Sequence, residues 1–123
     1  MATGHRIPND LYNSAMSASN IIKDPGSAGT IKVDISGGIC NLDSTVGVAR
    51  TLQSPLTVPE GVEITLVHET DGVAELDITY DGFGADANIE MDDDGDWIRL
   101  VVLSVNSVKS WHTVVKSSGV TIS

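Results

Sequence analysis

The chain has 123 residues, 17 of them acidic and 7 basic, which gives a formal net charge of −10 at pH 7. So strong an excess of negative charge repels phosphate groups, which argues against nucleic acids and anionic membranes as partners. The single cysteine, Cys40, excludes a disulfide or a cysteine zinc cluster within one chain. The length fits one domain, whose core must come mainly from Val, Ile and Leu because only five residues are aromatic.

The N-terminal sequence has no apolar signal core, and no apolar run approaches the length of a membrane span. These features predict a protein that is made in a cytoplasm and is not exported by a cleaved signal.

Residues 1–28 differ from the rest of the chain and are predicted to form an N-terminal arm, extended or with one short helix. The Pro-Gly step at Pro25 ends any helix that begins before it. Apolar side chains recur through the arm, and a free tail has little use for them. We therefore expect the arm to dock on a partner, with a disordered tail as the alternative. The expected contact residues are Ile7, Leu11, Tyr12, Ile21 and Ile22.

From residue 29 the hydrophobic period changes to two, which is typical of strands. Residues 30–36 alternate cleanly, and residues 62–68 and 73–80 are expected to pair as a hairpin across a Thr-Asp-Gly turn. Residues 97–105 are apolar on both faces and indicate a central strand. Seven to nine short strands without a long helix predict an all-β fold, an antiparallel β-sandwich or barrel-like domain over residues 29–123.

Residues 60–96 contain 13 acidic residues and no Lys or Arg. Within this stretch Asp92, Asp94 and Asp96 are candidate cation ligands, because hard cations take several oxygen ligands. No Glu closes the loop and no helices are predicted beside it, as a helix–loop–helix calcium site would require. An exposed turn with an Asp-Gly bend is therefore the competing interpretation, and no cofactor is predicted.

Residues with catalytic chemistry do not cluster along the sequence. His5, His68 and His112 fall on different predicted elements without metal-ligand spacing, and no serine lies in a G-x-S-x-G elbow. The glycine-rich steps do not open a helix, so they are not phosphate cradles. Trp97 and Trp111 each begin or lie near the start of a strand. Such residues favour a core or subunit interface, although both could instead stack on sugar rings.

The order of motifs resembles the small proteins that decorate the capsids of tailed phages, especially marine ones. The resemblance covers residues 29–123 and none of residues 1–28. The segments that carry it are GTIKVDIS (29–36), ARTLQSPLTVPEGVEITLVHETDG (49–72), LDITY (76–80), DDDGDWIRLVVLSV (92–105) and SWHTVVKSSGVTIS (110–123).

This resemblance implies a virion structural protein without enzymatic activity. It implies a decoration or cement protein on the capsid surface, bound as a homotrimer, with the major capsid protein and itself as partners. On this reading the arm contacts the capsid, Trp97 and Trp111 lie at the subunit interface, and the acidic residues 60–96 face outward. The alternative is a carbohydrate- or receptor-binding β module of a phage fibre or attachment protein.

Overall fold

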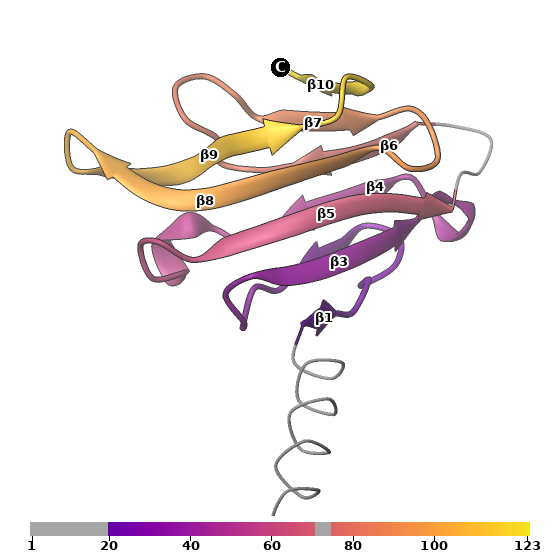
Figure 1. Cartoon of the computed structure of the whole chain (residues 1–123), viewed down its shortest axis with the longest axis horizontal. Helices are drawn as coiled ribbons and strands as arrows, with labels where there is room; N and C mark the ends of the chain where they lie inside the picture. Colours follow the sequence, from indigo (N-terminus) through magenta and orange to yellow (C-terminus); the bar gives the residue numbers. More distant parts are fainter. Residues whose placement is uncertain (1–19, 71–74) are drawn as a thin grey trace, which may run out of the picture.

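The structure is a computed structural model that describes residues 20–70 and 75–123 (Figure 1). Two five-stranded sheets pack face to face, so the predicted all-β sandwich is confirmed. Sheet A contains, in spatial order, β1 (Ile21–Ile22), β3 (Gly38–Asp43), β5 (Glu63–Thr70), β8 (Trp97–Val105) and β9 (Val108–Lys116). Sheet B contains β10 (Val120–Ile122), β7 (Asn88–Met91), β6 (Leu76–Thr79), β4 (Ala49–Leu52) and β2 (Gly29–Ile31). Two short 3-10 turns complete the elements, η1 (Ser44–Val46) and η2 (Pro55–Thr57).

The strand pairing is mixed rather than antiparallel. From β1 to β6 the chain alternates between the two sheets, so the strands within each sheet run the same way and pair in parallel. From β7 onward the pairs are antiparallel. The expected hairpin of residues 62–68 with 73–80 is wrong, because β5 pairs with β3 and β8 while β6 pairs with β4 and β7. Alternation fixes which side chains point inward, but it does not identify the neighbouring strand.

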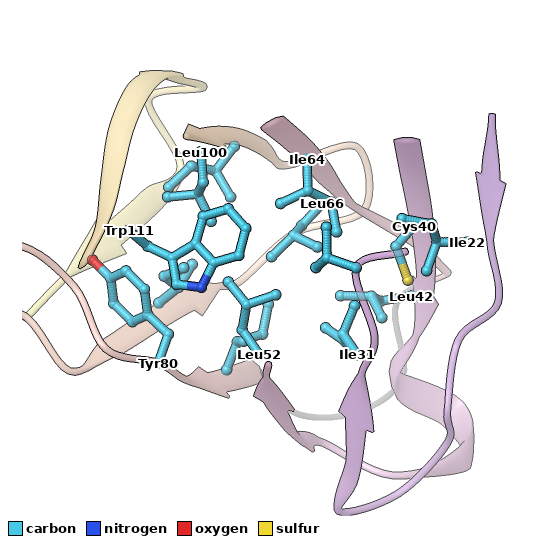
Figure 2. Close-up of a cluster of buried hydrophobic side chains, with 14 of the residues drawn as sticks. Ile22, Ile31, Cys40, Leu42, Leu52, Ile64, Leu66, Tyr80, Leu100 and Trp111 are labelled. Atoms are coloured by element: carbon cyan, nitrogen blue, oxygen red, sulfur yellow. The ribbon is translucent and has the colours of Figure 1, made fainter. Parts of the chain in front are cut away.

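The core lies between the sheets and consists almost entirely of aliphatic side chains (Figure 2). Trp111 of β9 is the largest of the fully buried side chains, with 1% of its surface exposed, and its indole Nε1 donates to the carbonyl oxygen of Gln53 at 2.9 Å. This bond satisfies the one polar atom of the ring. Trp111 therefore packs inside its own chain and not at the subunit interface expected from the sequence.

Residues 20–28 belong to the sandwich, which moves the start of the β domain to before residue 29. The two residues of β1 pair with Ile39 and Cys40 of β3. Ile22 is 6% exposed and joins the core, so its side chain is not available for the partner contact expected of it. Ile21 is 54% exposed and remains available. The other three expected contact residues, Ile7, Leu11 and Tyr12, lie outside the described residues.

A buried ion pair ties this N-terminal segment to both sheets. Arg50 is 1% exposed, and its guanidinium donates to both carboxylate oxygens of Asp24, from Nε at 2.7 Å and from Nη2 at 3.1 Å. Its remaining donors reach the carbonyl oxygens of Asp43, Gly47 and Ala49. Each branch of the guanidinium thus has a partner, which is the condition under which a buried charge is tolerated.

The carboxylate of Asp24 is equally well satisfied, since it also accepts from the backbone N–H groups of Gly26 and Asp43. Burial raises the pKa of Asp24, but the hydrogen bonds from Arg50 and these two backbone groups, together with the positive charge, outweigh it. The net effect lowers the pKa below its ordinary value of 3.8.

We expect the thiol of Cys40 to be unreactive while the protein is folded. Cys40 is fully buried, and burial, reinforced by the nearby charge of Asp24, raises its pKa to about 12. Because the thiolate is the reactive form, Ellman's reagent should label the native protein only at the rate of unfolding and should label it at once in denaturant. A Cys40→Ser variant provides the blank. Prompt labelling of the native protein would show that this strand opens to solvent.

Candidate functional site

The two outer faces of the sandwich differ in chemistry, and together they form the candidate site. Figure 1 looks onto the outer face of sheet A, with β9, β8, β5, β3 and β1 in order across the front. Strand register places one residue from each strand in a single row across this face: Ile21, Ile39, Thr65, Arg99 and Val115. Three members of the row are exposed aliphatic side chains.

Further rows with apolar side chains lie on both sides of this one, away from the β8–β9 turn and toward it. Val67 lies opposite Trp97, which is half-buried, and Val101 lies opposite His112. The hairpin reaches past the sheet B strands (Figure 1). Seven of the large hydrophobic residues exposed in the described chain belong to sheet A strands, and none belongs to a sheet B strand. The seven are Ile21, Ile39, Leu103, Val105, Val108, Val114 and Val115.

The outer face of sheet B is polar and negatively charged. One row across β2, β4, β6 and β7 consists of Thr30, Thr51, Thr79 and Asn88. In the next row Asp77 lies opposite Glu90. The one basic residue in these strands, Arg50, points inward and is neutralised by Asp24. A surface of this kind favours solvent and repels other acidic surfaces.

The predicted cation ligands are not brought together as a group of three. Asp96 is buried, and its carboxylate accepts from the backbone N–H of Asp93 at 3.0 Å and from the Ser117 hydroxyl at 3.4 Å. The Asp96 carboxylate therefore stabilises the turn between β7 and β8, whereas Asp94 is exposed on that turn. The sequence pattern could not separate a carboxylate that caps a turn from one that is free to bind an ion.

Asp92 instead lies with Glu75 and Glu90, and one carboxylate oxygen from each falls within 4.8 Å of the others. These oxygens could hold a divalent cation. In the absence of an ion they repel one another. A hydrogen bond with Glu90 and the negative charges of Glu90, Asp92 and Asp77 raise the pKa of the Glu75 carboxyl above its ordinary value of 4.5.

We expect Glu75→Gln to raise the unfolding temperature at pH 7. A carboxyl whose pKa is raised in the folded protein stabilises the fold below its unfolded pKa, and this contribution is lost as the pH rises through the folded value. The gain from the substitution should therefore be present at neutral pH and disappear below pH 4.5. Asp34→Asn, which removes an exposed carboxylate outside this cluster, is the matched control and should not reproduce the gain. An equal gain at pH 3 and pH 7 would contradict the repulsion.

A loop of residues 81–87 lies along the outer edge of β9 and pairs with it at Trp111. Gly82 forms a bridge with Trp111, and the ring of Phe83 stacks on His112 with centroids 4.5 Å apart. Beside the loop is an open depression of about 550 Å³, lined partly by Tyr80, Asp81 and Lys109. Burial, with the charge of Asp86 as a smaller cause, raises the pKa of Tyr80 to about 12, so its hydroxyl stays protonated at neutral pH.

The histidines remain separate from one another in the described part of the chain. His68 is fully buried, although the sequence indicated a surface or half-buried position, and its Nε2 lies 2.9 Å from the Ser44 hydroxyl. His112 interacts with Phe83 and with Ser110 on the outer face of sheet A. The structure therefore does not bring these two histidines together, and His5 lies outside the described residues.

No protein-family model and no curated protein matches this chain. Among the described residues there is no helix of the length and apolarity needed to span a membrane. The unlike faces of the sandwich and the order of the sequence motifs are therefore the features from which a function can be inferred.

Proposed function

We propose that this chain is a virion structural protein without enzymatic activity. It would decorate the head of a tailed phage as a homotrimer and stabilise the shell. The observation that carries the proposal is the contrast between the two outer faces of one small sandwich. A cement protein needs surfaces for its own subunits and for the shell, and it needs a third surface that keeps neighbouring virions apart.

The acidic side supports this assignment. The acidic residues Glu75, Asp77, Glu90 and Asp92 gather around the outer face of sheet B, without an exposed basic residue among its strands. Such a surface stays hydrated and repels its copies on other particles. The proposal places it outward on the virion.

The N-terminal side supplies the contact with the major capsid protein. Ile21, exposed at the edge of sheet A, marks where the chain enters the sandwich, and Ile7, Leu11 and Tyr12 precede it in the sequence. Three such arms on one trimer would bind several capsid subunits at once, so that weak contacts add to a strong one.

Three of the titratable groups with displaced pKa values also fit a non-enzymatic protein better than an enzyme. The Cys40 thiol and the Tyr80 hydroxyl are buried, with pKa values of about 12, so neither is poised as a nucleophile or base. Asp24 is neutralised by Arg50 within the sandwich. Catalytic groups normally line a cleft and titrate near the working pH.

Binding to capsids tests the proposal directly. Capsids assembled from the major capsid protein of the same genome should co-sediment with the full chain in a saturable manner and should then withstand higher temperature. A full-length variant with Ile7→Ala, Leu11→Ala and Tyr12→Ala should lose this binding while keeping its native mass and unfolding temperature. Leu56→Ala, at a 72% exposed site in η2, is the control and should bind normally. Failure of the wild-type chain to co-sediment would refute the decoration role.

A second candidate is a carbohydrate- or receptor-binding β module. The observation that favours it is the depression beside residues 81–87, where exposed Phe83 and the polar side chains of Asp81 and Lys109 lie close to the β8–β9 tip. Trp111 cannot stack on a sugar because it is buried, which leaves half-buried Trp97 and Phe83. Quenching of tryptophan fluorescence by glycans, lost in Phe83→Ala, would support this module. An unchanged spectrum across a glycan panel would count against it.

A further inference from the structure

We propose that the outer face of sheet A is the surface through which copies of this chain bind one another, in a head-to-tail ring of three. This inference rests on the proposed function, which requires a homotrimer, and it adds the identity of the interface. In such a ring two different parts of the face meet across each contact, and three contacts close the assembly.

The apolar side chains on this face are the first reason. Trp97 lies half-buried on β8 with Val67 of β5 as its cross-strand neighbour, and Val101 follows on the same side of β8. Ile39 and Leu103 extend the patch on either side and are 37% and 38% exposed. The row of Thr65 and Arg99 lies between Trp97 and Val101, so apolar side chains alternate with polar ones on this face and the tryptophan lies at one end of it. An exposed surface of this kind is typical of a protein–protein contact, in which tryptophan often carries much of the binding energy.

The charges on the face are the second reason, and they indicate a copy of the same chain as the occupant. Glu63 and Glu69 lie on β5 and Arg99 lies on β8, on the outer side of the sheet. Within the described residues none of these three side chains forms an ion pair. The face thus carries unpaired groups of both signs, and one copy can supply the partners that the next copy lacks.

The charge on the rest of the protein strengthens this argument. The chain carries a net charge of −10, and the charged side chains on the outer face of the sheet B strands, Asp77 and Glu90, are acidic. Two copies therefore repel each other when acidic surfaces approach. Residues 97–123 contain no acidic residue and include Arg99, Lys109 and Lys116, so β8 and β9 form the side of the molecule where this repulsion is weakest.

The β9 edge of sheet A is blocked, which favours the face over this edge as the surface for association. The β8–β9 register shifts beside Arg99, and Gly82 bridges to Trp111. Lys109 and Lys116 lie near the two ends of β9. A bulge, a covering loop and lysines are the features by which proteins prevent edge-to-edge pairing. Copies of this chain are therefore expected to meet through the face of sheet A and not to pair along β9.

The test compares face variants with a control on the opposite side of the sandwich. Light scattering across a dilution series should give three times the 12.9 kDa chain mass for the wild type. Ile39→Lys and Leu103→Lys replace exposed side chains, so the fold should tolerate them, and each should weaken association about tenfold. Thr51→Lys adds the same charge to the exposed outer face of sheet B and should leave the mass unchanged.

A charge exchange tests the complementarity. Arg99→Glu and Glu63→Arg should each weaken association, by up to about fivefold, and the double variant should recover most of the loss. Thermal unfolding of each variant confirms that it is folded. Face variants that keep the wild-type mass at every dilution would overturn the inference, as would a wild type that stays monomeric throughout.

These outcomes can be told apart from failure of the proposed function. If the face variants lose the trimer but the wild-type trimer does not co-sediment with capsids, the proposed interface stands and the decoration role is refuted. If the wild type binds capsids and the face variants still form trimers of the same mass, the decoration role stands and the proposed interface is refuted.

Discussion

Replacing Arg50 with leucine should destabilise the protein by about 3–5 kcal/mol, one of the two largest effects we expect from a single substitution. The change leaves the Asp24 carboxylate without its positive partner, and the carbonyl oxygens of Asp43, Gly47 and Ala49 lose their donor. Urea unfolding at a fixed protein concentration measures the loss. The fixed concentration matters because the stability of an oligomer depends on it.

Two controls identify the buried pair as the cause. Lys32→Leu removes the same charge from an exposed site and should change stability by no more than about 0.5 kcal/mol. Asp24→Leu combined with Arg50→Leu removes both charges and should recover part of the loss. Equal effects for Arg50→Leu and Lys32→Leu would contradict the structural role of the pair.

The Asp24–Arg50 pair should also make the stability of the protein fall as the pH is lowered. The folded pKa of Asp24 is lowered, so its ionised form stabilises the protein above the unfolded pKa, near 3.8, and this contribution is lost as the pH falls through the folded value. The stability difference between wild type and Asp24→Asn should therefore be full at pH 6 and shrink below pH 3.8.

Replacing Trp111 with alanine should cost a similar amount, about 3–5 kcal/mol, because the largest side chain of the core leaves a cavity between the sheets (Figure 2). Trp111→Phe keeps most of the apolar volume but loses the hydrogen bond from Nε1 to Gln53, so it should cost less. Chemical unfolding, again at fixed concentration, provides the comparison.

Trp97→Phe is the matched control for the tryptophan series. Trp97 is half-buried on the outer face, so its replacement should leave the stability of the isolated subunit nearly unchanged. It also leaves Trp111 as the one tryptophan in the chain, and the fluorescence of that variant should be blue-shifted, as expected for a buried indole. Emission typical of water would contradict the burial of Trp111.

The sequence pattern predicted the sandwich, and alternation indicated the inward face of strands such as β5. Ile64 and Leu66 of β5, for example, point into the core as their alternation requires. Strand partners could not be predicted in the same way, because β5 and β6 have the same pattern whether they pair with each other or lie in opposite sheets. The mixed pairing thus depends on tertiary packing that local periodicity does not encode.

The role of residues 20–28 could not be predicted because so short a strand leaves no period to detect. β1 has two residues, and its position depends on pairing with β3 and on the bond between Asp24 and Arg50. In the sequence Arg50 reads as an ordinary surface residue of an alternating strand. Long-range charge pairs of this kind become visible only when the strands are assembled.

The candidate site was predicted only in part for a related reason. Trp97 and Trp111 have similar sequence surroundings, yet Trp97 lies on the outer face and Trp111 in the core. The rows of side chains across sheet A involve residues from five separate strands, so the apolar face depends on the register and not on any one motif. Asp96 appeared to be a possible ion ligand until its turn hydrogen bonds were located.

The most direct test of the decoration role is a cryo-electron microscopy reconstruction of capsids saturated with this protein. We predict density with three-fold symmetry in which the outer faces of sheet A meet between subunits and the acidic outer face of sheet B points to solvent. Isolated single-subunit density, sheet B turned toward the shell, or capsids without added density would contradict the account.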